Sequence, residues 1–366
     1  MSVVQKTTMS RVKRNESLIA YLFIAPAAIG LLVFMIVPFF MAFYLSLTDT
    51  RLMSPNAAEF IALENYKDLL HIRTIQLDPL TDPETGAVEV DDEGNPVYPR
   101  SRDILRASEE TQGLRELTQF DLFGKHYLVA AGDPVFWIGM KNNFYFVFVV
   151  VPLQTAFALM LALLVNQKLK GSNIFRALFF TPVVVPMVVV AVIWFFLYNP
   201  GVGTINVFLE RISFGLIGPQ NWLVDPKLAF PSIMLLSIWQ GVGFQMVIFL
   251  AGLQEIPPEI YEAGAIDGCN KIQEFFFLTL PQLKNTTIFV LISTTILAFQ
   301  LFTQVDIMTG GGPSNSTMTT ILHVVNEGRG QLRAGYASAV TVVFFLVVLT
   351  ISILQRVIVK EERQVR

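Results

Sequence analysis

Six long apolar segments, separated by polar stretches, dominate the pattern of hydrophobic and polar positions along the chain. A helix needs about 20 apolar residues to cross the hydrocarbon core of a bilayer, and each segment reaches that length. We therefore predict an all-α polytopic membrane protein with six transmembrane helices. The predicted spans cover residues 18–47, 144–165, 174–198, 228–253, 286–307 and 336–359.

The composition agrees with a membrane protein and excludes several other classes. Of the 366 residues, 53% are hydrophobic and only 15% are charged, and the mean hydropathy is +0.55. Such a chain is too apolar for a soluble protein of this size, so we expect it among membrane lipids. The net charge of −3 argues against binding to a nucleic acid. The single cysteine, Cys269, and three scattered histidines support neither a disulfide, a metal site nor a catalytic group.

Basic residues next to the spans indicate which side of the membrane each loop occupies. Lysine and arginine concentrate in cytoplasmic segments, and six crossings place all the basic stretches on one side. The N-terminal tail resembles the start of a signal peptide, but its apolar run is too long, so we predict an uncleaved anchor. The basic residues are Lys6, Arg11, Lys13 and Arg14, then Lys168, Lys170 and Arg176, and finally Arg356, Lys360, Arg363 and Arg366.

This orientation fixes the remaining segments. We predict cytoplasmic tails at 1–17 and 360–366, so that both termini are cytoplasmic, and a cytoplasmic loop at 254–285. The periplasmic loops are then 48–140, 199–227 and 308–335. Prolines within or at the ends of the spans predict kinked helices around a pathway, with simple packing irregularity as the alternative. They are Pro26, Pro38, Pro152, Pro182, Pro186 and Pro231.

The first outer loop contains an insert at about residues 71–132, in which acidic residues outnumber basic ones about two to one. Its Pro- and Gly-rich centre predicts an exposed hairpin or mobile loop. Apolar positions at helical spacing predict a helix within 101–123. The acidic run Asp91, Asp92 and Glu93 lacks the spacing of an EF-hand, which favours a solvated turn over a calcium site.

Polar side chains within the fourth and fifth spans are the candidates for a substrate pathway, because polar groups inside a membrane are costly. Glutamine amides donate and accept hydrogen bonds, and aromatic rings offer a flat apolar face, so the set suits a neutral polyhydroxylated solute. The alternative is that these groups only bond to their own helices or join helices together. The candidates are Ser237, Trp239, Gln240, Gly241, Phe244, Gln245, Thr294, Gln300 and Gln304.

The absence of charged residues from the middle of the spans argues against other mechanisms. No lysine or arginine lies in the middle of a span, which argues against an anionic solute bound there. No carboxylate lies well inside a span to carry a coupling proton or sodium ion; Asp306, near an outer end, is the nearest candidate. The Gly-rich phosphate-binding loop of ATPases is absent, so the chain cannot hydrolyse ATP alone.

The cytoplasmic loop carries a spaced motif that resembles the EAA loop of bacterial ABC importer permeases. It departs from that motif at Gly264, where the family usually has alanine, and at Leu278, where it often has isoleucine. Longer stretches at 177–206, 238–268 and 302–317 resemble carbohydrate-uptake permeases of the maltose, trehalose and glycerol-phosphate type. The motif residues are Glu262, Ala263, Gly264, Asp267, Gly268, Leu280 and Pro281.

The resemblance implies the type I ABC importer permease fold in a bacterial inner membrane. It also implies a second homologous permease, two ATP-binding subunits that hold ATP and magnesium, and an extracytoplasmic solute-binding protein, with no cofactor on this chain. The motif residues would couple the permease to the ATPase. Sugar contacts of the maltose-type permease fall on positions that are partly apolar here: Val183, Met187, Ser237, Gly241, Phe244, Thr294, Ala298 and Leu301.

We therefore expect a subunit that imports a sugar, such as a di- or oligosaccharide, by ATP-driven alternating access and without chemistry on the solute. Import of glycerol phosphate or a polyol remains open within the same family, as does a stand-alone secondary transporter. By analogy with the maltose-type permease, the insert is expected to grip the binding protein; a lid or an incidental elaboration are the alternatives. A membrane-embedded enzyme or receptor would need a catalytic cluster or a soluble domain, and neither is visible.

Overall fold

The computed structural model describes residues 16, 19–82, 87–167 and 171–358. The chain forms two compact units, one of residues 1–66 with 327–342 and the other of residues 67–326 with 343–366. Most of the basic residues that predict the orientation, in the two tails and at 168–170, lie outside the described residues.

Helices long and apolar enough to cross a membrane dominate the described chain. Four are continuous: Ile19–Leu45, α5 (Pro134–Asn166), α9 (Ala229–Gln254) and α16 (Ala334–Ile358). Two more candidates are bent pairs, which would bring the number to six if each pair is one span. The first joins α6 (Ser172–Val184) to α7 (Met187–Leu197) at 97°, and the second joins residues Lys271–Gln282 to α13 (Lys284–Phe299) at 67°.

Proline chemistry explains the sharper of the two bends. Val185 is extended, with φ −76° and ψ 130°, and Pro186 is the N-cap of α7. A proline disfavours helical backbone in the residue before it and lacks the N–H that would continue the helix. Pro152, in contrast, lies inside the continuous helix α5. The sequence-based expectation of proline-kinked helices therefore holds at Pro186.

The fifth predicted span is shorter than expected. We predicted helix as far as residue 307, but α13 ends at Phe299 and the separate helix α14 (Thr303–Met308) follows. Between them, Phe302 has φ −144° and ψ −65°, which is not helical. The sequence pattern did not indicate this break because the apolar and polar residues continue through it without a glycine or proline.

The smaller unit contains the first apolar helix, whose end is fixed by hydrogen bonds. That helix includes η1 (Leu32–Ile36) and α2 (Val37–Leu45). Asn65, at the start of α3 (Glu64–Leu70), is buried and its amide donates to the carbonyls of Ser46 and Thr48 at 2.8 and 2.9 Å. These bonds satisfy carbonyls that the helix end leaves without a helical partner.

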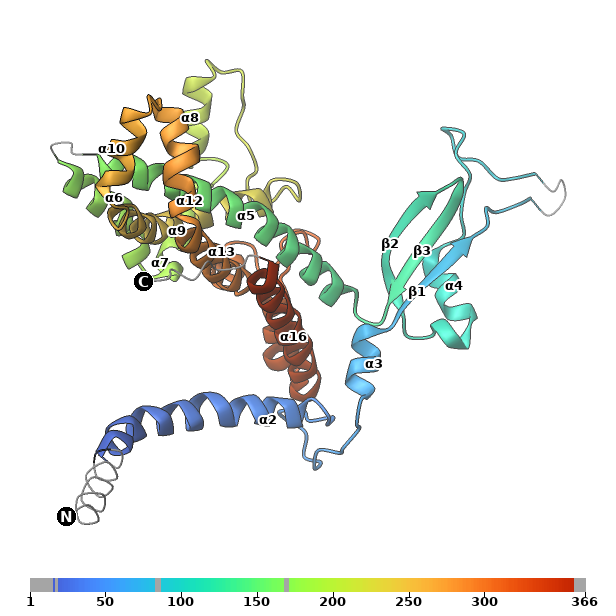
Figure 1. The fold of residues 1–366 in the computed structure, drawn as a ribbon. Helices are drawn as coiled ribbons and strands as arrows, with labels where there is room; N and C mark the ends of the chain where they lie inside the picture. Colours follow the sequence, from blue (N-terminus) through green and yellow to red (C-terminus); the bar gives the residue numbers. More distant parts are fainter. Residues whose placement is uncertain (1–15, 17–18, 83–86, 168–170, 359–366) are drawn as a thin grey trace, which may run out of the picture. The chain divides into compact units, whose positions relative to one another are not determined.

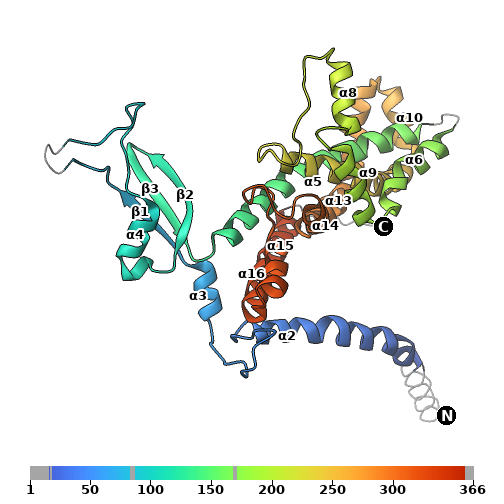
Figure 2. The same cartoon turned by 180° about the vertical axis from the view of Figure 1, so that it is seen from behind.

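The insert folds as a small α+β element rather than a loop. Its antiparallel sheet has the order β1 (Ile72–Leu77), β3 (Lys125–Ala131), β2 (Arg115–Leu122), and both views place β3 in the middle (Figures 1 and 2). Phe123 and Gly124, with φ 51° and 74°, form the two-residue turn between β2 and β3. Positive φ at both positions is typical of a tight hairpin turn.

The structure confirms a helix within 101–123, but only over the first two turns of that stretch. The structure has α4 (Ser101–Ala107), a short 3₁₀ turn η2 (Glu109–Thr111), and then strand β2. Gly113 separates the two parts with φ +90°. Pairing of β2 with β3 outweighs the helical spacing of the apolar residues, and the all-α expectation consequently fails for the insert.

The larger unit has its core between α5 and α9, with α13 and α6 packed against this pair. The same unit also contains the short helices α8 (Thr204–Ile212), α14 and α15 (Thr320–Val325). The π-helix η4 (Asn326–Gly330) begins at the last residue of the first stretch of the larger unit. A buried pair joins the ends of two elements, because His323 Nε2 of α15 lies 2.6 Å from Asp133 Oδ2 before α5. The other carboxylate oxygen of Asp133 accepts from the backbone N–H of Phe136 and caps α5.

Substitution of a glycine in α9 can test how closely the helices are packed. A Cβ at Gly243 would lie 2.1 Å from the carbonyl oxygen of Phe179 in α6, so Gly243→Ala must push the two helices apart. We expect it to lower the free energy of unfolding by about 1–3 kcal/mol, as overpacked cores do. Thermal unfolding of the purified chain in detergent measures this.

Gly30→Ala is the matched control, because no atom lies within 4 Å of a Cβ there and alanine favours helix. Equal melting temperatures for the Gly243→Ala and Gly30→Ala variants would contradict the close contact between α6 and α9.

Candidate functional site

A cavity of about 460 Å³ lies among the helices of the larger unit. Its walls come from α5, α9, α13 and the short helix α14, with Val183 of α6 and Met187 of α7 from the bent pair. The described residues that line it include five glutamines, two serines and a threonine, and none of them is acidic or basic. The cavity can therefore hydrogen-bond a solute but offers it no formal charge.

Hydrogen bonds between lining residues fix part of this polar surface. The Gln245 amide donates to Thr294 Oγ1, which joins α9 to α13. The Gln304 amide of α14 donates to Ser237 Oγ at 3.2 Å, and this hydroxyl donates to its own helix at the carbonyl of Ile233. The side-chain oxygen Oε1 of Gln245 is buried and has no hydrogen-bond partner among the described residues.

Eight of the nine pathway residues predicted from the sequence line this one cavity, including Gln240, Gly241, Phe244 and Gln300. So do all eight positions carried over from the maltose-type permease. Trp239 does not: its ring lies 5.5 Å from that of Trp194, and it borders a separate apolar depression. Asp306 is exposed on α14 and is not part of the lining.

The sequence reasoning missed Gln154, a buried residue of α5 that lines the cavity. A Cβ at Gly241 would lie 2.2 Å from Gln154 Nε2, so this amide rests on the bare backbone of α9. No hydrogen bond of the Gln154 side chain is found among the described residues. Its signal in the sequence is a single amide in an apolar run, which a search for polar groups within the second span would have found.

The motif of the predicted cytoplasmic loop lies on a short helix, α10 (Pro258–Ile266). Pro257 is its N-cap and Pro258 its first residue, where a proline costs no hydrogen bond. Glu262 and Ala263 are exposed on α10, whereas Gly264 is buried. Exposed carboxylate and methyl groups on a short helix are available to a partner.

Gly268 ends this helix in the left-handed conformation, with φ +77°. The backbone N–H of Cys269 reaches back to the carbonyl of Gly264 at 2.9 Å, the closing bond of a Schellman cap. Asp267, which is exposed, stands at the C-cap. A residue with a side chain at Gly268 would strain this turn, which is the turn expected after the docking helix.

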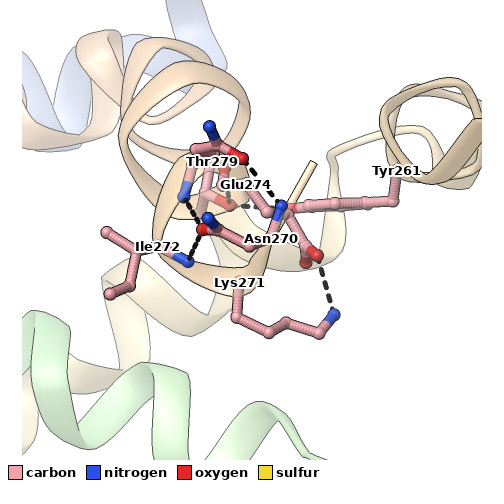
Figure 3. Close-up of polar contacts among 7 residues, drawn as sticks. Tyr261, Asn270, Lys271, Ile272, Glu274 and Thr279 are labelled. Carbon is pink, nitrogen blue, oxygen red and sulfur yellow. Dashed lines mark hydrogen bonds and ion pairs between the residues drawn. The ribbon is translucent and has the colours of Figure 1, made fainter. Parts of the chain in front are cut away.

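A second helical segment follows at once and packs on the first. Asn270 caps α11 (Lys271–Gln273) by accepting from the N–H groups of Ile272 and Gln273 (Figure 3). The segment continues as the π-helix η3 (Glu274–Thr279) and α12 (Leu280–Gln282), which contains Leu280 and Pro281 of the motif. Figure 3 shows Tyr261 of α10 pointing to Thr279, and their hydroxyls lie 3.3 Å apart.

The two departures from the EAA pattern touch each other in space. A Cβ at Gly264 would lie 2.5 Å from Leu278 Cδ1. The Leu278 side chain therefore occupies the space in which an alanine methyl would stand. Gly264 weakens the helix by about 1 kcal/mol relative to alanine, and the leucine contact fills the gap that it leaves.

Comparison with known proteins places this geometry in a family. Residues 154–364 match the model of the "Binding-protein-dependent transport system inner membrane component". The chain is 30% identical over 343 residues to the probable ABC transporter permease protein YurN of Bacillus subtilis, covering 93% of this chain and 96% of that protein. It is 37% identical over 236 residues to the lactose transport system permease protein LacF of Rhizobium radiobacter, covering 63% and 78%.

A solved structure has the same fold. A chain of a bacterial ABC transporter involved in the import of the acidic polysaccharide alginate aligns with a TM-score of 0.68 at 17% identity, covering 98% of this chain and 100% of that one. The type I permease fold and the resemblance to carbohydrate-uptake permeases predicted from the sequence are thereby confirmed. The chain belongs to the family of inner membrane components of binding-protein-dependent transport systems, the permeases of ABC importers.

Proposed function

We propose that this permease moves a neutral sugar, a di- or oligosaccharide, into the cytoplasm through the cavity between α5, α9 and α13. The observation that carries the proposal is the lining itself, in which amides and hydroxyls abound and no residue is charged. Sugars are recognised by such groups, and a phosphate or carboxylate would call for arginine or lysine. The amide of Gln154 is one of the hydrogen-bonding groups of the lining that are offered to the solute.

The chain does no chemistry on the solute in this proposal. Two partner ATPases bind ATP and magnesium, and a second homologous permease contributes the other half of the pathway. An extracytoplasmic binding protein delivers the sugar. Both termini and the loop with α10 face the cytoplasm, where Glu262 and Ala263 meet the ATPase.

Purification of the tagged chain from native membranes tests this assembly. We expect mass spectrometry to find an ATPase, a second permease with an EAA loop and a binding protein. The complex in proteoliposomes should then take up lactose, trehalose or maltose in preference to glycerol 3-phosphate. Preferred uptake of glycerol 3-phosphate would refute the neutral solute, and uptake by the chain alone, driven by an ion gradient, would refute the importer.

Substitutions in the loop test the coupling. Glu262→Gln removes an exposed carboxylate, and Gly268→Val forces a side chain into the left-handed region at a cost of about 1–3 kcal/mol. We expect each variant to lower ATPase stimulation by the loaded binding protein at least tenfold while the subunits still co-purify. The measurement is ATP hydrolysis with and without loaded binding protein.

Glu255→Gln is the control, because Glu255 is also exposed but precedes α10. Full stimulation in the Glu262→Gln variant would remove that residue from the coupling surface.

A pair of substitutions tests the cavity. Gly241→Ala places a methyl group 2.2 Å from Gln154 Nε2 and must displace this amide. We expect the KM for sugar uptake to rise several-fold with little change in the melting temperature, because only a side chain has to move. Adding Gln154→Ala should relieve the steric clash, so the double variant should bind better than the two single effects predict.

Uptake kinetics in proteoliposomes measure the KM, and thermal unfolding measures the melting temperature. Strictly additive effects of the two substitutions on KM would show that Gly241 and Gln154 do not interact in the working transporter.

A further inference from the structure

The segment that connects α7 to α9, residues 198–228, is rigid although it contains little regular structure. It includes helix α8, which is yellow-green in Figure 1, and it is organised around the buried side chain of Asn206. The Asn206 amide donates to the carbonyls of Pro200 and Gln220 at 3.2 and 3.0 Å. Its oxygen accepts from the Gln220 N–H at 3.1 Å and from the indole N–H of Trp222 at 2.7 Å. One side chain thus joins both ends of the segment.

Trp222 fixes this segment to the two neighbouring candidate spans. Its ring lies 5.6 Å from that of Tyr198, the C-cap of α7. The Tyr198 hydroxyl donates to the carbonyl of Ser232, in the first turn of α9, at 3.0 Å. Only six residues separate Leu197, the end of α7, from Thr204, the start of α8. A fully extended chain of that length covers about 25 Å at most, so α8 lies close to the end of a span.

The turn that ends α8 is a complete Schellman cap with an unusual residue in it. The N–H of Gly215 donates to the carbonyl of Glu210 at 2.8 Å, and the N–H of Phe214 donates to that of Arg211 at 3.3 Å. These are the two hydrogen bonds that define this cap. Phe214 has φ +52° and occupies the left-handed position at which glycine is the usual residue. A bulky side chain is strained in that conformation.

Packing within the chain does not explain this phenylalanine. Phe214 is 94% exposed, so its own chain covers almost none of it, and Leu216 is 88% exposed. The turn is nevertheless fixed, because the N–H groups of Leu216 and Ile217 donate to the carbonyl and the hydroxyl of Ser213, at 3.0 Å each. Two large apolar side chains are therefore held away from the protein, where only something outside the chain can cover them.

The exposed apolar surface continues from this turn onto α8. Phe208 and Ile212 stand four residues apart, on one side of the helix, and both are exposed. Glu210 lies two residues from each of them and therefore on the other side. From residue 212 to residue 219 the chain contains no charged residue. We call Phe208, Ile212, Phe214 and Leu216 the apolar edge.

Membrane lipid is the occupant that fits the apolar edge. Tyr198 and Trp222 carry polar groups on apolar rings, and such side chains collect where a membrane meets water. α7 exposes Phe196 next to its end, so the lipid-facing surface of this span continues up to the segment. A helix with exposed apolar residues on one side and charged residues on the other lies in the membrane interface with its apolar side toward the acyl chains. The edge has no charged side chain with which to orient a protein partner.

We propose that the apolar edge is an interfacial anchor, in which Phe214 and Leu216 insert among the lipids where the membrane meets water. Contact with lipid accounts for a phenylalanine at a position that favours glycine. α9 is the one predicted span between this segment and the loop with α10, so the anchor lies in the opposite leaflet. Through Trp222 and Tyr198 it holds the first turn of α9, a helix of the cavity wall, at a fixed depth. The anchor depends on the membrane location of the chain and not on its solute.

Photocrosslinking at single positions identifies what covers the edge. The photoreactive residue p-benzoylphenylalanine replaces Phe214 or Leu216 in the full chain, in nanodiscs of phosphatidylethanolamine and phosphatidylglycerol, both alone and with its co-purified subunits and binding protein. Mass spectrometry after irradiation reports the mass of each adduct. We expect lipid adducts at both positions, about tenfold more abundant than at Glu210, the exposed control on the other side of α8. The same residue at Phe196 of α7 checks that the photoreaction works.

Two outcomes of the crosslinking would overturn the anchor. An adduct of position 214 or 216 with the binding protein or with a second permease would assign the edge to a protein interface. No adduct at either position, with a working photoreaction at position 196, would place the edge in water.

The variant Phe214→Gly tests the anchor without a label. Glycine suits the left-handed conformation at this position, so the melting temperature should not fall. We expect hydrogen exchange of the α8 amides in nanodiscs to become several-fold faster, because the anchor is lost. Unchanged exchange in the Phe214→Gly variant would overturn the anchor, whatever the melting temperature.

Discussion

Two adjacent asparagines hold together the irregular chain on which the cavity depends. The helix of the fifth span stops at Phe299, and helix α15 begins at Thr320. Asn143 of α5 bridges these ends, since its amide donates to the carbonyl of Phe299 at 3.1 Å and its oxygen accepts from the N–H of Thr320 at 2.9 Å. Asn142 donates to the carbonyl of Met318 at 2.9 Å. Irregular backbone at or near membrane depth needs such partners, because lipid offers none.

Helix α9 determines both the shape and the polarity of the cavity. Two glycines of α9, two residues apart, each leave space for a different neighbouring helix. Gly243 allows the backbone of α6 to approach, and Gly241 leaves room for the Gln154 amide of α5. The stop after Phe299 then lets α14 turn its own residue, Gln304, toward Ser237 of α9. Close packing and an available polar surface thus arise from the same helix.

The sequence was most informative where polar residues interrupt apolar spans. Such groups are costly in a membrane, and the predicted pathway residues Ser237 and Gln245 both line the cavity. Trp239 was predicted with them but borders a separate depression. Residues that hydrogen-bond to backbone groups far away in the sequence, such as Asn143, could not be identified because their partners lie more than 150 positions away. Strand β2 was missed because its pairing with β3, across a two-residue turn, outweighs the helical spacing of its apolar residues.

The paired departure at Gly264 and Leu278 shows how the loop can be altered without losing its rigidity. Leu278 fills the space above the bare backbone of Gly264, and the hydroxyls of Tyr261 and Thr279 meet beside this contact. Through them α10 is held against η3, which continues through α12 to α13 after a 67° bend. Because Thr294 of α13 lines the cavity, a short series of packed helices connects α10 to the cavity wall. A flexible loop would absorb a displacement of α10, whereas the tight Gly–Leu contact would transmit it to η3.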